Sequence, residues 1–369
     1  MCTRNPLHCI VPPHVLLSIA EKGSAEQKQQ ARRSLIVSEQ IRGMRFIASQ
    51  TPRAAATGQK RRSIYTAANT LTLPGTLVRS EGGKKTGDPA VDEAYDGFGD
   101  TYDLYLNQYG RNSLDNAGMR LVGTVHYSQD YDNAFWDGRQ MVFGDGDGTL
   151  FRRFTRSLDV IAHELTHGVV EHTANLVYWD QPGALNESCA DVFGSLVKQE
   201  KLKHDVKRAD WLIGAELLAS GVQGKALRSL AAPGTAYDDD VLGRDPQPAH
   251  MDDYVETNDD NGGVHINSGI PNHAFYLAAK AIGGRAAVKA GRIWYVALRD
   301  RFRRKTTFQE AANYTYSVAG ELFGSGSLEQ KAVRDAWKAV GLPPNSVKLK
   351  VIEKIVEVST PIEEEEAYA

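Results

Sequence analysis

The run His163-Glu164-Leu165-Thr166-His167 constrains the fold of this chain more than any other stretch of its sequence. Residues four apart on an α-helix lie on one face, so His163 and His167 would present two imidazoles at a spacing that suits one zinc ion. Glu164 lies on the neighbouring edge of that helix, where its carboxylate can serve as the general base of a zinc hydrolase. The same pattern also arises by chance in proteins whose histidines cap a helix or pack in a core. The surrounding sequence must therefore distinguish a metal site from a structural helix.

The bulk composition indicates a globular protein whose partners are neither nucleic acid nor membrane. With 369 residues, of which 41% are hydrophobic, the chain can form two domains or one large domain with extensions. The net charge of -3 and the spread of Lys and Arg along the chain argue against binding to backbone phosphates. No stretch approaches the ~20 consecutive apolar residues that a membrane helix needs.

The cysteines and the N-terminus bear on the cellular compartment. The chain has three cysteines, Cys2, Cys9 and Cys189, which excludes a disulfide-rich scaffold. Pro12-Pro13 interrupts the apolar start of the chain, whereas a secretory signal needs an uninterrupted apolar core of roughly 7–15 residues. We therefore expect cytoplasmic synthesis without a cleavable export signal.

Pattern and composition divide the chain into four parts. Residues 1–56 combine helical periodicity with a small, polar, basic linker that is suited to proteolysis. Residues 57–172 contain short β-type runs and end in the histidine helix, and residues 173–346 are mainly helical, with one helix expected over 210–219. Residues 347–369 form an acidic tail that we expect to be partly disordered. The expected fold class is α+β, with a β-rich N-terminal lobe and a mainly α-helical C-terminal lobe.

A third metal ligand is needed, because a catalytic zinc site has three protein ligands and one open position. Glu187 is the candidate, and Asp191 stands four residues later on the same helix face. Glu187 can bind zinc while Asp191 accepts the free ring N–H of a ligand histidine, and the side-chain oxygen of Asn186 can hold the other histidine. The alternative is an acidic helix start that only compensates the helix dipole.

Two further side chains can stabilise the oxyanion that forms when water attacks a peptide carbonyl. His265 lies in a glycine-containing stretch, and the carboxylate of Asp260 can orient its ring and favour its protonation. Tyr178, between the two metal-binding motifs, is the second candidate. Taken singly, each of these residues also fits a structural turn or a half-buried aromatic.

These motifs resemble, in order and spacing, those of the thermolysin-like zinc metallopeptidases (the M4 family), and the resemblance runs over about residues 70–342. It implies a two-lobe thermolysin-like fold with the zinc cleft between the lobes. It also implies one Zn²⁺ per chain and Glu164 as base and proton shuttle. The remaining site roles implied are zinc ligation by His163, His167 and Glu187, support of these ligands by Asp191 and Asn186, and stabilisation of the tetrahedral intermediate by Tyr178 and His265 with Asp260 behind His265.

The resemblance extends to the substrate-binding strand and its pocket. Residues 133–148 match the family's edge strand, which places Asn133 and Ala134 beside the peptide, and Arg228 would bind the carbonyl just past the scissile bond. The pocket for the next side chain would be lined by Phe151, Phe154, Val160, Ile213, Leu217 and Leu227. Because all six are apolar, we predict cleavage on the N-terminal side of bulky apolar residues.

One departure from the family concerns calcium. Many members hold a double calcium site beside the cleft, and here Asp159 is retained while Lys198 and Ala215 occupy matching positions. A lysine ammonium can replace a cation electrostatically by pairing with the remaining carboxylates. We therefore predict that this site holds no calcium.

The N-terminal segment around Pro12-Pro13 resembles the short propeptides of protealysin-like enzymes, although His14 departs from that subgroup's Pro-Pro-Leu pattern. Such propeptides are removable inhibitors and folding aids. Either Cys9 or His8 supplies a zinc ligand in the proenzyme, or Cys9 is a small packing residue. The expected partners are peptide or protein substrates and the chain's own propeptide, and we expect a monomer.

The expected function is thus a zinc-dependent neutral endopeptidase made as an autoinhibited proenzyme. One rival is a zinc aminopeptidase, which needs an acidic anchor for the substrate's free amine. The other is a non-catalytic binding protein in which zinc only holds the lobes together, although such a structural zinc site needs no general base such as Glu164. Family members commonly work outside the cell, so extracellular action would require a non-classical release.

Overall fold

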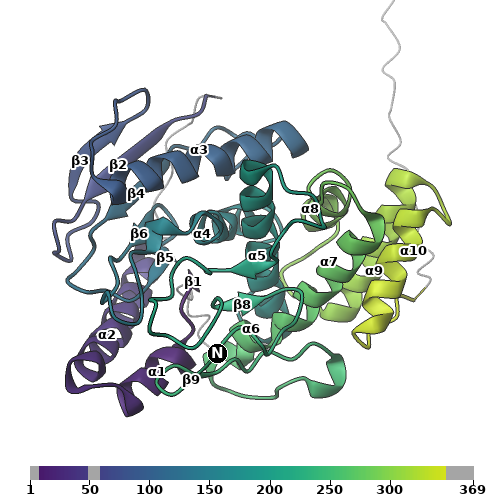
Figure 1. Cartoon of the computed structure of the whole chain (residues 1–369). Coiled ribbons are helices and arrows are strands. Elements are labelled where there is room, and N and C mark those ends of the chain that lie inside the picture. The colour runs from purple at the N-terminus through teal and green to yellow at the C-terminus, as the bar shows by residue number, and fades with distance from the viewer. Residues whose placement is uncertain (1–7, 49–58, 346–369) are drawn as a thin grey trace, which may run out of the picture.

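A mixed β-sheet forms the N-terminal lobe of the computed structural model, which describes residues 8–48 and 59–345 (Figure 1). Its strand order is β1-β5-β6-β4-β2-β3, and the β2–β4 and β4–β6 pairs are parallel while the others are antiparallel. The strands are β1 (His8–Cys9), β2 (Arg62–Thr66), β3 (Thr76–Ser80), β4 (Leu121–Val125), β5 (Ala134–Trp136) and β6 (Met141–Phe143).

The long helix α3 (Pro89–Tyr109) packs on this sheet. The Asp88 side chain accepts a hydrogen bond from the Ala90 N–H at its start, and Gly110 ends it in the left-handed conformation with φ 68°. A Cβ at Gly123 of β4 would lie only 2.7 Å from the Phe98 ring, so the glycine permits the close approach of helix and strand. The sheet and α3 together support α4 (Leu158–Glu171), which carries the histidine motif.

The C-terminal lobe is mainly helical. Its helices are α5 (Asp180–Leu202), α6 (Asp260–Asn267), α7 (Gly269–Ile282), α8 (Ala290–Asp300), α9 (Phe308–Phe323) and α10 (Leu328–Ala339). Short strands β7 (Leu212–Ile213) and β8 (Arg228–Ser229) pair with each other, as do β9 (Asp238–Asp239) and β10 (Gly243–Arg244), and 3-10 turns span η1 (Phe154–Arg156) and η2 (Met251–Asp253). The α5 helix packs closely against α4.

The N-terminal segment contributes β1 and the helices α1 (Pro13–Lys22) and α2 (Ala25–Ala48), which contact both lobes (Figure 1). On α1, Ser18 Oγ donates to the Val241 carbonyl at 2.8 Å in the C-terminal lobe. On α2, Ser38 Oγ lies 3.1 Å from the Tyr131 hydroxyl in the N-terminal lobe. The segment therefore bridges the two lobes across the cleft.

The two-lobe α+β architecture predicted from the sequence is confirmed, but the helix expected over residues 210–219 is wrong. Residues 212–213 instead form β7, because Trp211 and Gly214 adopt left-handed backbone angles, φ 57° and φ 71°, that a helix cannot accommodate. The predicted linker after residue 48 and the predicted acidic tail lie outside the described residues. Among the helices that are described, none is both long and apolar enough to cross a membrane.

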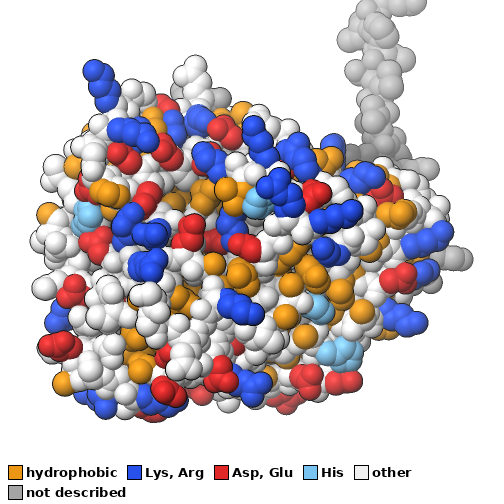
Figure 2. Space-filling model, viewed as in Figure 1, with side chains coloured by type: hydrophobic (Ala, Val, Ile, Leu, Met, Phe, Trp, Pro, Cys, Tyr) orange, Lys and Arg blue, Asp and Glu red, His pale blue; other side chains and the backbone are white. Residues whose placement is uncertain are grey.

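Surface charge agrees with the mixed composition. Figure 2 shows basic and acidic side chains interspersed over the face in view. Ion pairs such as Lys201 with Asp100 at 2.9 Å and Arg301 with Glu321 at 2.8 Å join side chains of opposite sign.

Candidate metal centre and peptide-binding cleft

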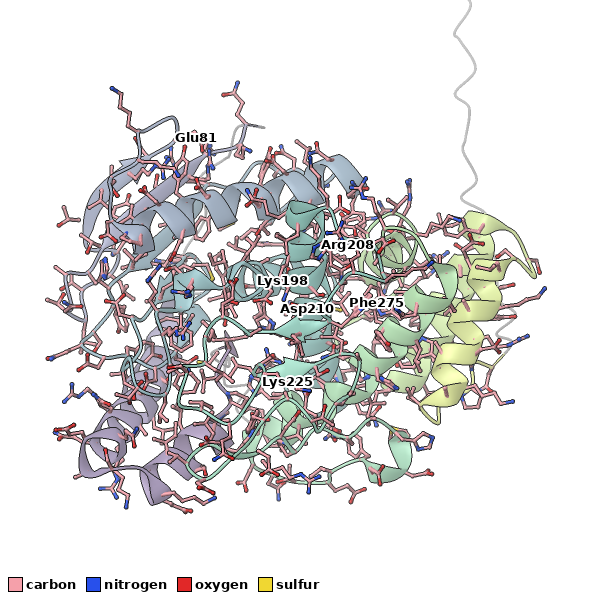
Figure 3. All side chains as sticks on the ribbon, viewed as in Figure 1. Glu81, Lys198, Arg208, Asp210, Lys225 and Phe275 are labelled. Atoms are coloured by element: carbon pink, nitrogen blue, oxygen red, sulfur yellow. The ribbon has the colours of Figure 1, made fainter. Side chains whose placement is uncertain are left out.

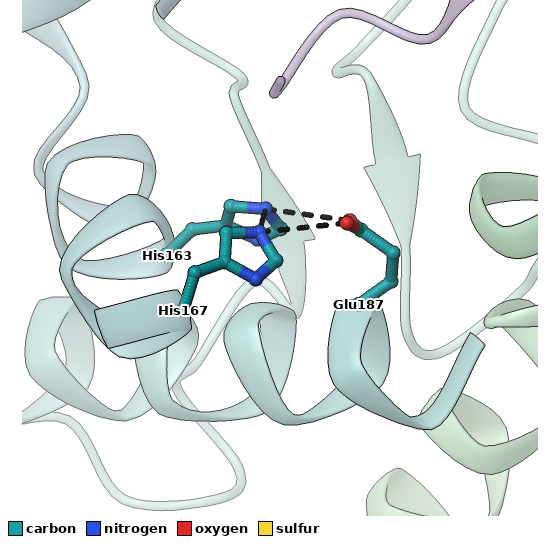
Figure 4. A group of neighbouring side chains, drawn as sticks. All are labelled: His163, His167 and Glu187. Carbon is teal, nitrogen blue, oxygen red and sulfur yellow. Dashed lines mark hydrogen bonds and ion pairs between the residues drawn. The ribbon is translucent and has the colours of Figure 1, made fainter. Parts of the chain in front are cut away.

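Helices α4 and α5 bring three potential metal ligands together. A Cβ at Gly194 of α5 would lie 2.5 Å from the Asp159 carbonyl of α4, so this glycine lets the two helices approach closely. His163 and His167 project from α4 toward Glu187 on α5 (Figure 4). All three side chains are 0% exposed, and their ligand atoms lie within 4.8 Å of one another.

The spacing of these three side chains fits a tetrahedral zinc site. The two Nε2 atoms of His163 and His167 lie 3.0 Å apart, and each lies 3.4 Å from a carboxylate oxygen of Glu187. Ligands at 2.0–2.1 Å from a tetrahedral zinc are separated by roughly 3.3 Å. The three donor atoms therefore surround a point at which one zinc ion fits.

Hydrogen bonds to the Nδ1 atoms of both histidines turn their Nε2 atoms toward that point. Asn186 Oδ1 lies 2.9 Å from His167 Nδ1, and Asp191 Oδ1 lies 2.8 Å from His163 Nδ1, so both Nδ1 atoms donate. Burial lowers the pKa of His167 to about 3, which keeps this ring neutral with its lone pair on Nε2. Glu187 Oε2 has no hydrogen-bond partner in the described part of the chain. A divalent cation would satisfy the facing lone pairs and this carboxylate together.

Glu164 is fully buried beside the metal ligands. Neither of its carboxylate oxygens has a hydrogen-bond partner of ordinary geometry among the described residues. Burial raises the pKa of Glu164 well above its usual value, because charge is costly there without a partner. A buried acceptor of this kind is suited to take a proton from a water molecule in the cleft.

Tyr178 and His265 converge on the same space from the other side. The Tyr178 hydroxyl donates to Glu187 and lies 3.1 Å from His265 Nε2, while His265 Nδ1 lies 2.6 Å from Asp260 Oδ1. Burial lowers the pKa of His265, but the nearby charge of Asp260 outweighs it and the net pKa is raised. His265 is thus held as a donor toward the cleft.

The chain reaches His265 through a run of left-handed residues at the start of α6. Asp260, Asn261, Gly262 and Gly263 have φ angles of 52°, 53°, 81° and 73°. Asparagine, aspartate and glycine tolerate this conformation best, which explains their concentration in this stretch. The turn allows both the His265 backbone N–H, at 2.9 Å, and its ring to reach the Asp260 carboxylate.

Arg228 on β8 belongs to the same network. Its Nε and Nη2 atoms each lie 2.8 Å from an oxygen of Asp191, and the guanidinium is only 2% exposed. Asn272 of α7 also donates to Asp191 Oδ2 at 2.8 Å. Asn272 is not among the residues predicted from the sequence, because its only local signal is that of a polar residue on a helix.

The N-terminal segment lies in the cleft as an extra strand. The Ile10 N–H donates to the Ala134 carbonyl at 3.2 Å, and the Val11 N–H donates to Asn133 Oδ1 at 3.0 Å. Arg228 Nη1 donates to the Ile10 carbonyl at 3.0 Å. Ala134, Asn133 and Arg228 are the residues predicted to bind a substrate backbone, and here they bind the chain itself.

The predicted specificity pocket is apolar and closed to solvent. Its six residues are between 0% and 3% exposed: Phe151, Phe154, Val160, Ile213, Leu217 and Leu227. They belong to the same hydrophobic cluster as Ile10, which is itself 0% exposed.

The position of Cys9 bears on the choice between a zinc ligand and a packing residue. Cys9 is 4% exposed and packs in a hydrophobic cluster with Tyr127, Tyr131 and Phe135. In the described ranges, the group of side chains able to hold a metal comprises His163, His167 and Glu187, without Cys9. These contacts favour packing for Cys9; the His8 side chain lies outside the described residues.

Lys198, which was predicted to replace calcium, lies between carboxylates of two segments. Its Nζ lies 2.7 Å from Asp159 Oδ2 and 3.0 Å from Asp210 Oδ1, and it donates to the Leu212 carbonyl at 2.8 Å (Figure 3). Burial lowers the pKa of Lys198, but the charges of Asp159 and Asp210 outweigh burial and the net pKa is raised, so the amine stays protonated. Ala215 offers no side-chain oxygen to this cluster.

Comparison with known families matches almost the whole chain. The profile described as "Thermolysin metallopeptidase, catalytic domain" matches residues 23–171, and "Thermolysin metallopeptidase, alpha-helical domain" matches residues 174–342. An extracellular metalloprotease of Pectobacterium carotovorum subsp. carotovorum is 51% identical over 92% of this chain and 97% of its own length. Protease PrtS of Photorhabdus sp. is 48% identical over 90% of this chain and 91% of its own length.

A solved structure extends the similarity to the N-terminal segment. The precursor of protealysin, a metalloproteinase from Serratia proteamaculans, superposes with a TM-score of 0.84 at 50% identity. The match covers 91% of this chain and 99% of that chain.

The expectation of cytoplasmic synthesis with non-classical release is wrong in the light of these relatives. The Pectobacterium relative is named an extracellular metalloprotease, and a Serratia marcescens relative that is 43% identical is named an extracellular minor metalloprotease. Pro12-Pro13 opens α1 in a segment that docks on the catalytic lobes, so the interruption of the apolar run has a structural role and says nothing about export.

Proposed function

The chain belongs to the thermolysin family of zinc metallopeptidases, and from this premise we propose that it is a neutral endopeptidase made as an autoinhibited proenzyme. The observation that carries the proposal is the docking of the chain's own N-terminal backbone in the cleft. The Cys9 carbonyl lies 3.0 Å from His265 Nε2, and the following carbonyl, of Ile10, is held by Arg228 at 3.0 Å. A peptide substrate of the mature enzyme would take the same place.

Endopeptidase activity is favoured over aminopeptidase activity by the path of this segment. His8 continues the strand opposite Trp136, and Cys9 pairs with Phe135, so the backbone extends past His265 in both directions. An aminopeptidase would close this end of its cleft with an acidic anchor for a free amine. A cleft that admits a continuing chain suits bonds in the interior of a peptide.

The proposed mechanism assigns each side chain one task. Zinc held by His163, His167 and Glu187 would supply Lewis-acid polarisation of the carbonyl and a lowered pKa for water. Glu164 accepts the proton of the attacking water and delivers it to the leaving amine.

Charge that develops on the carbonyl oxygen is stabilised by two donors, Tyr178 and His265, and Asp260 keeps the His265 ring oriented and protonated. Arg228 holds the next carbonyl of the substrate and so fixes the register of the peptide. This complete catalytic set disfavours the rival in which zinc only staples a binding protein.

We further propose that the buried apolar pocket selects bulky apolar residues after the scissile bond. Ile10, which follows the Cys9 carbonyl, is fully buried and belongs to the large hydrophobic core that also contains the six predicted pocket residues. Burying such a side chain is worth about 1.5–3 kcal/mol relative to leaving it in water. Equal rates on peptides that differ only at this position would contradict the assignment.

In the same way we propose that Lys198 replaces calcium beside the cleft. Its ammonium neutralises Asp159, which is 0% exposed and lies on the helix that carries the zinc histidines. A divalent ion would have to displace this bound cation while gaining no oxygen ligand from Ala215.

We also propose the division of the chain into a propeptide, two catalytic lobes and a tail. Residues 1–56 would be the removable propeptide, residues 57–172 and 173–346 the two catalytic lobes, and residues 347–369 a tail. The relatives' names support action on peptide or protein substrates outside the cell. A monomeric state is part of the same proposal.

Casein hydrolysis tests the proposal, after incubation that allows the propeptide to be removed. Wild type should hydrolyse casein and lose activity to a zinc chelator, and Glu164→Gln should lower kcat by at least ~1,000-fold. Glu256→Gln, an exposed carboxylate outside the site, is the matched control and should keep full activity. Activity that persists in Glu164→Gln would defeat the assignment.

A further inference from the structure

The backbone from Cys9 to Val11 lies along β5 and contacts the residues predicted to bind a substrate backbone. It runs antiparallel to β5, and both N–H groups that face the strand are bonded: Ile10 to the Ala134 carbonyl and Val11 to Asn133 Oδ1. The Asn133 side chain also donates to the Val11 carbonyl at 3.3 Å. From this geometry, and resting on the proposed peptidase function, we propose that the Cys9–Ile10 peptide bond is a self-cleavage site.

The carbonyl at the reaction point is that of Cys9. It lies 3.0 Å from His265 Nε2, one of the two proposed oxyanion donors, and the hydroxyl of the other, Tyr178, lies 3.1 Å from that same nitrogen. The next carbonyl, of Ile10, is bound by Arg228. Shifting the segment by one residue would break both of these contacts, so the register identifies one bond.

The residue after this bond meets the proposed specificity. Ile10 is a bulky apolar side chain, fully buried in the cluster that contains the six pocket residues. The segment thus makes the predicted backbone contacts and also buries an apolar side chain after the bond, as a good substrate would.

Contacts on either side of the cleft hold the segment in place before and after the cut. On α1, His14 Nε2 lies 3.1 Å from the Tyr237 hydroxyl and Ser18 donates to Val241. On α2, Ser34 Oγ accepts from the Asp132 N–H at 3.3 Å. Because the bond is tethered to its own catalytic site, the reaction is intramolecular and needs no second molecule.

The chemistry is ordinary hydrolysis with water as co-reactant. The oxygen of water adds to the Cys9 carbonyl carbon, the C–N bond to Ile10 breaks, and Glu164 carries the proton to the leaving nitrogen. The products are a carboxylate on Cys9 and an amine on Ile10. Residues from Ile10 onward keep their contacts through α1 and α2, so the nicked proenzyme retains its docked segment.

Intact mass and N-terminal sequencing of the full-length, zinc-loaded chain test the proposal. Incubation should produce a fragment ending at Cys9 and a new N-terminus at Ile10, and Glu164→Gln should produce neither. Ile10→Gly, which empties the pocket, should slow this cut at least ~10-fold. Leu17→Ala, on the exposed face of α1 where Leu17 is 52% exposed, is the matched control and should leave the rate unchanged.

A mixing experiment separates cleavage within one chain from cleavage between chains. Wild type added to the Glu164→Gln chain should leave the Cys9–Ile10 bond of that chain intact while its docked segment stays in place. Rapid cutting of this bond in the inactive chain would overturn the intramolecular proposal.

Hydrogen exchange gives a readout that does not depend on activity. In the full-length Glu164→Gln chain the Ile10 and Val11 amides should exchange slowly, and Asn133→Ala in that background should accelerate exchange at Val11. Fast exchange at both amides of the Glu164→Gln chain would overturn the docked register.

Casein hydrolysis run in parallel separates a failure of the proposed self-cleavage site from a failure of the proposed peptidase function. Casein cleavage with an intact Cys9–Ile10 bond would contradict the self-cleavage site and remain consistent with the peptidase assignment. Absence of casein cleavage, after the N-terminal segment has been removed by an added protease, sinks the peptidase assignment itself.

Discussion

Asp191 binds Arg228 through two hydrogen bonds of 2.8 Å, from Nε to Oδ2 and from Nη2 to Oδ1, and accepts the ring N–H of His163 at 2.8 Å. One carboxylate therefore orients a zinc ligand and the arginine that binds the peptide backbone. The arginine and the histidine hold the pKa of Asp191 at about 2 against the opposing effect of burial. The metal centre and the substrate register are coupled through this residue.

Asp191→Asn should impair both zinc binding and peptide binding. Loss of an outer partner typically weakens metal affinity 10–100-fold, and Arg228 would lose its charged partner, so KM should also rise. Asn186→Ala is the matched control: it frees His167 alone and should weaken zinc binding without raising KM. Competition with a chelator and steady-state kinetics measure the two effects, and an unchanged KM in Asp191→Asn would contradict the coupling.

Lys198→Ala should destabilise the protein, because Asp159 would keep a buried charge without its cation. Breaking a buried pair by removing one partner costs about 3 kcal/mol or more. Lys201 lies on the same helix as Lys198 and forms an exposed ion pair with Asp100 of α3. Lys201→Ala should therefore cost less than about 1 kcal/mol.

Thermal unfolding with and without calcium checks the role of Lys198. The Tm of wild type should not respond to calcium or to a calcium chelator. A calcium-dependent rise in the wild-type Tm would show that the ion still binds beside Lys198.

Acid should loosen the N-terminal segment through His14. Burial lowers the pKa of His14 to about 4; Asp260 opposes the shift, whereas His265 and Arg228 add to it. The docked ring is neutral and its Nδ1 has no hydrogen-bond partner in the described chain. Docking is therefore fully stable above pH 6.5, weakens as the pH falls from 6.5 toward 4, and should be roughly 30-fold weaker at pH 5 than at pH 8.

His14→Leu tests this pH dependence, because leucine cannot bind a proton. Removal of residues 1–56, which requires the docked segment to leave the cleft, should accelerate at pH 5 in wild type and much less in His14→Leu, as followed by gel. Ser18→Ala, which removes an uncharged hydrogen bond of the docked segment, should speed the removal of residues 1–56 about equally at both pH values. Equal acid responses of wild type and His14→Leu would rule out this histidine as the sensor.

His126 should stabilise the N-terminal lobe as a cation. Its ring bonds Asp145 at 2.8 Å and Asp88 at 2.9 Å, and these carboxylates outweigh burial and raise its pKa to about 9. A raised pKa in the folded state gives stability that is complete below pH 6.5 and is lost as the pH rises through 9.

Denaturant titrations of wild type and His126→Gln should therefore differ most at pH 6. We expect a difference of about 2 kcal/mol there, after allowance for the partial exposure of the pair. The difference should shrink as the pH approaches 10. A difference that stays constant across this range would mean that the charge of His126 does not contribute.

Local sequence determined the parts of the site whose spacing a helix sets. His163, Glu164 and His167 fall on adjoining helix positions, and Glu187 and Asp191 repeat the four-residue interval, so their relative directions follow from helix geometry alone. The fold class followed from the change of pattern between the two halves. These features depend on residues close in sequence, which is why no tertiary information was needed.

Tertiary packing decided the features that join distant residues. Whether residues 210–219 form a helix depended on Leu212 finding Ser229 as a strand partner. The contact of Cys9 with His265 joins two segments that are 256 residues apart in the sequence. No local pattern encodes such a contact, because it exists only when β5, α1 and α6 are assembled around one cleft. The sequence thus determined which chemistry the chain carries, and the folded structure decided what occupies the cleft.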